Sequence, residues 1–118
     1  MLPNYKIPYG NHKLDQKDID EVNKILNSNF LTQGPQVELF EKNVNKFVGS
    51  KFSVAVNSAT SALHISCLAL DLQPGDYLWT VPNSFVASAN CGRYCGSNID
   101  FVDIDSKTWN ISIEKLEE

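Results

Sequence analysis

The order of short apolar segments after residue 51 constrains the fold of this chain most, because strand-like and helix-like patterns alternate there. Residues 52–56, 77–81 and 99–104 are short runs rich in β-branched and aromatic residues, which predicts strands. Each run is followed by a segment with helical character, near residues 59–70, 85–94 and 112–118. Strands that alternate with helices predict a parallel α/β sheet.

Two helices are expected ahead of this sheet. Asp15 suits an N-cap, and the apolar residues that follow it have helical spacing. Pro35 suits the first turn of a second helix, and Gly49 suits its C-terminal stop. The sequence therefore divides into an arm (1–14), two helices (15–49) and α/β units (50–118), within one portion of a larger domain. The expected fold class is α/β, with a β-α-β-α-β parallel sheet after the two leading helices.

Charge and composition exclude several functional classes. The net charge is −4 and the pI is about 5.1, and the basic residues are scattered, which argues against nucleic-acid binding. No apolar run reaches the roughly 18–20 residues of a membrane span. The polar N-terminus does not resemble a signal peptide, so a cytoplasmic protein is expected. The cysteines number three, and an odd count without a secretory signal argues against a disulfide framework. A metal site would need further ligands, and His12 and His64 are not spaced to supply them.

The turn at residues 57–62 is the strongest chemical signal in the sequence. Its residues are small and polar, and it lies between a predicted strand and a predicted helix. The first amides of a helix have no intrahelical acceptors and the helix dipole favours anions there, so the turn suits a phosphate group. Ser58, Thr60 and Ser61 add hydroxyl donors. The alternative is plain N-capping by Asn57 or Ser58, which requires no ligand.

Other candidate residues give weaker signals. Phe85 follows the second predicted strand and is suited to stacking on a planar ring, although packing in the core is the commoner role of a phenylalanine. If the third strand extends to Asp103 and Asp105, their side chains share a face, which could suggest a metal site. A polar strand end that enters a turn is the better explanation for two aspartates at these positions.

Four stretches together resemble the DegT/DnrJ/StrS family of sugar-nucleotide aminotransferases, which have the type I fold of enzymes that use pyridoxal 5'-phosphate (PLP). They lie in the expected order and cover nearly all of the chain. The second and third are most similar to the branch that acts in pseudaminic acid biosynthesis. The stretches are Phe-Leu-Thr-Gln-Gly-Pro (30–35), Asn-Ser-Ala-Thr-Ser-Ala-Leu (57–63), Pro-Asn-Ser-Phe-Val-Ala-Ser-Ala-Asn (82–90) and Phe-Val-Asp-Ile-Asp (101–105).

The resemblance implies a role for particular residues. In that branch, PLP carries an amino group from glutamate to a UDP-linked 4-keto-6-deoxy sugar. The backbone amides of Ala59 and Thr60 and the Thr60 hydroxyl would hold the cofactor phosphate. Phe85 would stack on the pyridine ring. The implied cofactor-binding residues are Ser58, Ala59, Thr60 and Phe85, and the implied substrate-binding residues are Tyr9, Asn29, Phe30, Leu31, Thr32 and Ala59.

The resemblance also implies what these residues lack. The family's Schiff-base lysine and its acidic partner of the pyridine nitrogen lie downstream of the third strand, and none of the nine lysines here has the matching context. We therefore expect an N-terminal fragment that is inactive alone and belongs to a homodimeric parent enzyme. The alternatives are a fragment of a sugar dehydratase of the same family, a non-catalytic phosphate or nucleotide-sugar module, and a chain that completes its fold with another chain.

Overall fold

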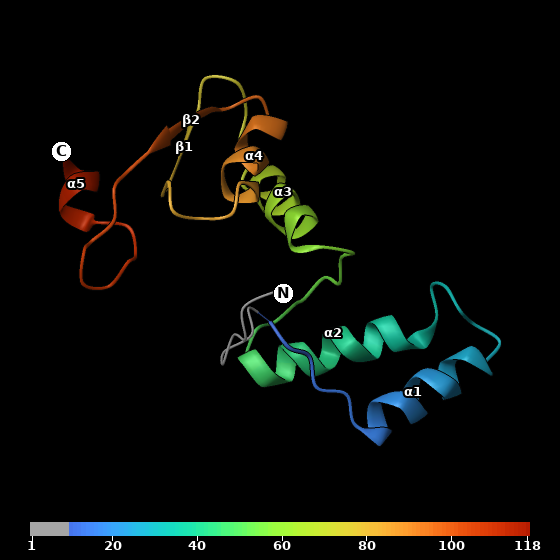
Figure 1. Ribbon diagram of the computed structural model, residues 1–118. Coiled ribbons are helices and arrows are strands. Elements are labelled where there is room, and N and C mark those ends of the chain that lie inside the picture. Colours follow the sequence, from blue (N-terminus) through green and yellow to red (C-terminus); the bar gives the residue numbers. More distant parts are fainter. Residues whose placement is uncertain (1–9) are drawn as a thin grey trace, which may run out of the picture. The chain divides into compact units, whose positions relative to one another are not determined.

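The computed structural model describes residues 10–118, which form two compact units divided between Ala55 and Val56 (Figure 1). The first unit contains the helices α1 (Gln16–Leu26) and α2 (Pro35–Val48). The second contains α3 (Ala59–Ala69), β1 (Tyr77–Thr80), α4 (Ala87–Tyr94), β2 (Asn98–Phe101) and α5 (Ile113–Glu117). The two leading helices and the later α/β alternation agree with the sequence prediction.

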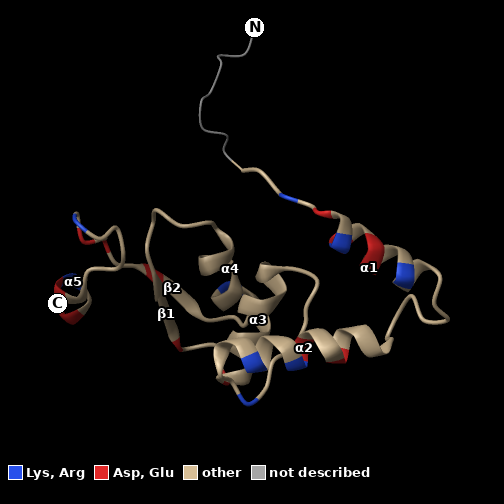
Figure 2. Ribbon diagram, turned by 90° about the horizontal axis from the view of Figure 1, so that it is seen from below, with Lys and Arg blue, Asp and Glu red and all other residues tan. Residues whose placement is uncertain are grey.

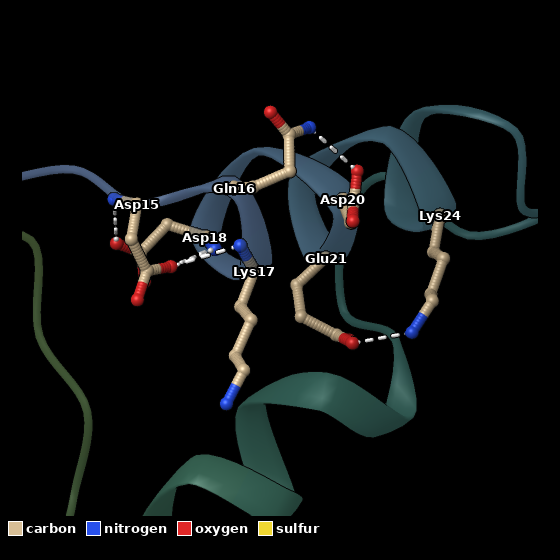
Figure 3. A network of polar contacts seen from close by, with 7 residues as sticks. All are labelled: Asp15, Gln16, Lys17, Asp18, Asp20, Glu21 and Lys24. Atoms are coloured by element: carbon tan, nitrogen blue, oxygen red, sulfur yellow. Dashed lines mark hydrogen bonds and ion pairs between the residues drawn. The ribbon is translucent and has the colours of Figure 1, made fainter.

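Helix α1 begins with a complete capping box. The Asp15 carboxylate accepts hydrogen bonds from the amides of Lys17 and Asp18, at 2.8 and 3.1 Å, and Asp18 Oδ2 accepts one from the Asp15 amide at 3.0 Å (Figure 3). This exchange satisfies donors that the first turn of a helix otherwise leaves without partners. The predicted N-cap is confirmed.

Helix α2 begins and ends where proline and glycine predict. Pro35 is its first residue, where the missing N–H costs nothing. Gly49 follows the last turn with φ 73°, a left-handed conformation that glycine adopts without steric cost. Its amide donates to the Asn45 carbonyl at 2.9 Å, which closes the helix. Neither α1 nor α2 has a buried residue.

The sheet of the second unit has two parallel strands, with Tyr77 opposite Asn98 and Thr80 opposite Phe101. Helix α4 connects the strands, contacts both of them and also packs on α3 (Figure 1). The buried apolar residues of the described chain are Cys67, Ala87, Cys91 and Val102. Helix α4 is therefore the centre of this unit, and the predicted parallel α/β class is confirmed.

Two strand predictions need correction. Residues 52–56 form no strand, because among residues 10–118 no backbone segment pairs with them, and a strand requires a partner to complete its ladder. The last strand ends at Phe101 rather than at Ile104. Ile104 instead makes an isolated antiparallel bridge with Ile111, since the chain turns back after β2. The observed order in the second unit is therefore α-β-α-β-α.

Charged residues of both signs are interspersed along α1 and α2 (Figure 2). Within residues 10–118, no helix has the length and apolar character needed to cross a membrane.

Candidate functional site

The turn that precedes α3 is built by three side chains. Ser58 has an extended backbone and caps the helix, since its Oγ atom accepts a hydrogen bond from the Ser61 amide at 3.1 Å. The Ser61 hydroxyl donates to Asn57 Oδ1 at 2.7 Å and so fixes the orientation of the asparagine. The sequence alternative of N-capping by Ser58 is thus correct as a description of the local structure.

Capping nevertheless leaves two amides available. The Ala62 amide donates to the Ser58 carbonyl at 3.1 Å, and the Ser61 amide donates to Ser58 Oγ. Among the described residues, the amides of Ala59 and Thr60 have no hydrogen-bond acceptor. These are the two amides that the family resemblance assigns to a phosphate. They lie at the positive end of the helix dipole, where an anion is stabilised.

Phe85 lies in the loop between β1 and α4, not in the core. Its side chain is 75% exposed, so core packing does not account for it in the described chain. The loop borders a hollow of about 180 Å³. Thr80 and Phe101, the last residues of the two parallel strands, also line this hollow. Phe85 is therefore at the carboxyl edge of the sheet, where open α/β sheets bind ligands.

The expected substrate residues Asn29, Phe30, Leu31 and Thr32 lie in the loop between α1 and α2. The amide of Phe30 donates to Ser28 Oγ at 3.3 Å, and Phe30 and Leu31 are both exposed. A Cβ atom on Gly34 would lie 2.9 Å from the Cβ of Phe30, so the tight return of this loop requires glycine. Tyr9 lies outside the described residues.

The predicted sites fall into separate units. Ser58, Ala59, Thr60 and Phe85 belong to the second unit, on or next to helices α3 and α4, which pack on each other. The substrate loop belongs to the first unit.

Trp109 was not among the residues predicted from the sequence to form a site. It lines a hollow of about 460 Å³ together with Asn83 and Asn110, beside the carboxyl end of β1. The Asn83 side chain donates to the Trp109 carbonyl at 3.5 Å, and Trp109 has φ 63°. A positive φ is unusual for a bulky residue. Asn83 and Trp109 are 26 residues apart in the sequence, and only the fold brings them together. The one sequence feature that could have drawn attention to Trp109 is the turn at Asp105, which precedes it.

The aspartates after β2 have structural roles. Asp105 accepts hydrogen bonds from the amides of Thr108 and Lys107, which lower the pKa of its carboxyl group. Asp103 forms an ion pair with Lys115 at 2.7 Å, which likewise lowers the pKa of Asp103. Within residues 10–118, no group of three or more His, Cys, Asp or Glu side chains is arranged as metal ligands. The hydrogen bonds of Asp105 with the Lys107 and Thr108 amides support the interpretation of these aspartates as a polar strand end that enters a turn.

The three thiols meet where α3 packs on α4. Burial raises the pKa of Cys67 to about 11, and hydrogen bonding with Cys91 adds to the effect. Cys67 and Cys91 are buried and Cys95 is half-buried. A thiol with such a pKa stays protonated at neutral pH, so Cys67 contributes to packing rather than to nucleophilic chemistry.

Comparisons with known proteins agree with the resemblance seen in the sequence. Residues 12–118 match the model of the DegT/DnrJ/EryC1/StrS aminotransferase family. The spore coat polysaccharide biosynthesis protein SpsC of Bacillus subtilis is 41% identical over 97% of this chain and 29% of its own length. The UDP-4-amino-4,6-dideoxy-N-acetyl-beta-L-altrosamine transaminase of Campylobacter jejuni is 39% identical over 94% of this chain and 29% of its own length.

A solved structure gives the same result for the fold. The PLP form of Spr1654 from Streptococcus pneumoniae, assigned as a sugar aminotransferase, superposes with a TM-score of 0.89 at 28% identity. The superposition covers 96% of this chain and 29% of Spr1654. The chain thus spans less than a third of the length of the relatives that it matches.

Proposed function

This chain belongs to the DegT/DnrJ/EryC1/StrS aminotransferase family, and on that premise we propose that it provides the phosphate-binding and ring-stacking part of a PLP site. The observation that carries the proposal is the pair of amides without acceptors at Ala59 and Thr60, at the start of α3. When bound, PLP supplies the electron sink that lets an amino group pass from a donor to a keto sugar.

The residues at this turn fit a phosphate group. The Ala59 and Thr60 amides donate, the Thr60 hydroxyl adds a third donor, and the helix dipole favours the negative charge. Ser58 caps α3 and fixes the turn, because its Oγ atom accepts a hydrogen bond from the Ser61 amide. Phe85 offers an exposed aromatic face at the carboxyl edge of the sheet, which suits stacking on a planar ring.

For the parent enzyme, we propose amination of a UDP-linked 4-keto-6-deoxy sugar with glutamate as the donor, in pseudaminic acid or related nucleotide-sugar biosynthesis. The 39% identity with the C. jejuni transaminase supports this choice. Tyr9, Asn29, Phe30, Leu31 and Thr32 would contact the sugar nucleotide, as would Ala59. The parent would act as a cytoplasmic homodimer.

Phosphate recognition can be tested with pyridoxamine 5'-phosphate, whose amine cannot react with surface lysines. We expect it to bind the chain more tightly than pyridoxamine does, by about tenfold or more in calorimetry. Thr60→Pro removes two of the three donors, the Thr60 amide and the Thr60 hydroxyl. Proline is tolerated in the first turn of a helix, so α3 should persist while this preference disappears. Thr60→Ser keeps both the amide and the hydroxyl and is the matched control. Equal affinity for pyridoxamine and its phosphate would contradict the proposal.

Covalent chemistry needs a separate test. We expect the 118-residue chain not to transaminate alone, because none of its lysines matches the Schiff-base position. Incubation with PLP and borohydride should give only scattered, substoichiometric lysine adducts in mass spectrometry. A stoichiometric adduct at one lysine, accompanied by turnover of glutamate, would disprove this expectation without affecting the phosphate test.

A further inference from the structure

Trp109 has a strained backbone within a tightly bonded turn. Its φ angle is 63°, a left-handed conformation that a bulky residue adopts only at a cost and that glycine adopts without steric strain. The Trp109 amide donates to the Asp105 carbonyl at 2.9 Å, and the Asp105 amide donates to the Asn110 carbonyl at 2.9 Å. The Asp105 carboxylate accepts two further amides of the turn, at 2.7 and 2.9 Å. These bonds hold Trp109 in its conformation against the steric cost.

Packing does not explain a tryptophan at this position. The Trp109 side chain is 69% exposed, so its indole ring buries little apolar surface within residues 10–118. Glycine would form the same turn without the steric cost. Residues held in strained conformations cluster where a protein binds ligands, and an exposed indole is suited to such a contact. What tryptophan adds to the turn is therefore an exposed aromatic face.

This indole ring lines the hollow of about 460 Å³ at the carboxyl end of β1. Trp79 lines the same hollow from the strand, and its ring stacks on Tyr77 with 6.4 Å between the ring centres. The hollow adjoins the smaller one beside Phe85, because part of the lining is common to both. The shared residues are Thr80, Val81 and Ser84.

The lining of the larger hollow indicates the chemistry of its ligand. Among residues 10–118, no charged side chain lines it, so it offers no charge to a phosphate or carboxylate group. The side chains of Asn83 and Asn110 supply hydrogen-bond donors and acceptors. Aromatic faces with a few convergent amide groups suit a neutral ligand that has an apolar face and hydroxyl groups at its rim. A hexose ring has this character.

We propose that Trp109 and Asn110 form a binding site for the hexose ring of a nucleotide sugar. The inference rests on the proposed function in one respect, that the cofactor ring lies at Phe85. The sugar carbon that receives the amino group must lie next to that ring, so a hexose site has to adjoin the hollow at Phe85. The shared lining meets this requirement. The hexose site does not include Ala59 or Thr60, so sugar binding does not require phosphate binding at the α3 turn.

The test uses N-acetylglucosamine, a neutral hexose, and uridine diphosphate, a nucleotide without a hexose. Trp79 and Trp109 are the two tryptophans of the chain, and both line the hollow, so fluorotryptophan gives two fluorine NMR signals that report on it. N-acetylglucosamine should shift the Trp109 signal saturably, with a Kd on the order of millimolar. Uridine diphosphate should leave that signal unchanged over the same concentrations.

Trp109→Gly separates binding from folding. It removes the indole ring and suits the positive φ angle, so the urea midpoint should stay the same or rise. The affinity for N-acetylglucosamine, followed at Trp79, should fall by about tenfold or more. Trp109→Phe keeps an aromatic face and is the matched control, with an affinity within about threefold of the wild type. A tryptophan with a purely structural role would instead be needed for stability and not for sugar binding.

Three results would overturn the proposal. They are the absence of a saturable shift with N-acetylglucosamine, an unchanged affinity in Trp109→Gly, and a shift of the Trp109 signal by uridine diphosphate of the same size. The last would make the nucleotide the occupant. If Trp109→Gly fails to fold, Asn110→Ala decides, because it removes a hydrogen-bonding group from the hollow and should also weaken binding by about threefold or more. The comparison of pyridoxamine with its phosphate tests the α3 turn separately, so either proposal can fail without the other.

Discussion

Gly92 of α4 lies so close to Ile99 of β2 that a Cβ atom on Gly92 would be 2.6 Å from Ile99 Cδ1. The same atom would lie 2.8 Å from Ser97 Oγ and 3.2 Å from the Cβ of Leu78. Helix α4 contacts both strands at this point, so glycine sets the distance between helix and sheet. We expect Gly92→Ala to lower the free energy of unfolding by about 1–3 kcal/mol in urea titrations.

The control for Gly92→Ala is Gly10→Ala, where a Cβ atom would meet nothing within 4 Å. The double variant Gly92→Ala/Ile99→Val should recover part of the loss, because valine lacks the Cδ1 atom that is in the way. A Gly92→Ala protein as stable as the wild type would show that α4 does not approach the sheet this closely in solution.

Loss of the Ser58 cap should weaken the start of α3. Ser58→Ala removes the acceptor of the Ser61 amide and should cost about 1 kcal/mol, measured as the urea dependence of helical circular dichroism. Ser66→Ala is the matched control: Ser66 Oγ donates to the Ala62 carbonyl within the helix, so this change should stay within about 0.5 kcal/mol. An equal loss in both variants would argue against the cap.

The Cys67 thiol should make stability depend on alkaline pH. Its pKa rises from 9.0 in the unfolded chain to about 11 in the folded one, since burial disfavours the thiolate. The unfolded chain therefore releases this proton first, and the stabilising contribution is complete below pH 9.0 and is lost as pH rises through about 11. Stability measured across that interval should fall more steeply for the wild type than for Cys67→Ala. Parallel curves would refute the assignment.

The ion pair between Asp103 and Lys115 should be visible in the titration of Asp103. The 2.7 Å contact lowers the pKa of the Asp103 carboxyl, so the pair's contribution is present above its ordinary value of 3.8 and is lost as pH falls through the lowered one. NMR titration of the carboxyl carbon should show the pKa rising in Lys115→Met and unchanged in Lys107→Met. If the pKa of Asp103 does not change in Lys115→Met, the ion pair does not form in solution.

Features that depend on neighbours in the sequence were predictable. The Asp15 capping box, Pro35 at the start of α2 and Gly49 in a left-handed conformation are formed by residues within a few positions of one another. The same holds for the turn before α3, where the Ser58 cap leaves the next two amides without acceptors. Local sequence determines these features because each hydrogen bond closes a short loop of chain.

Contacts between distant residues could not be read from the sequence. The tertiary structure decided that residues 52–56 find no partner among the described residues, that β2 ends at Phe101 and that Gly92 touches Ile99. It also brought Asn83 to Trp109 and Cys67 to Cys91. The physical reason is that strand propensity describes a residue's fit to a sheet, whereas the ladder needs a second backbone. The sequence by itself therefore determined the helices, the caps of α1 and α3, and the alternation of helices and strands after residue 59. Only the tertiary structure decided which segments have partners.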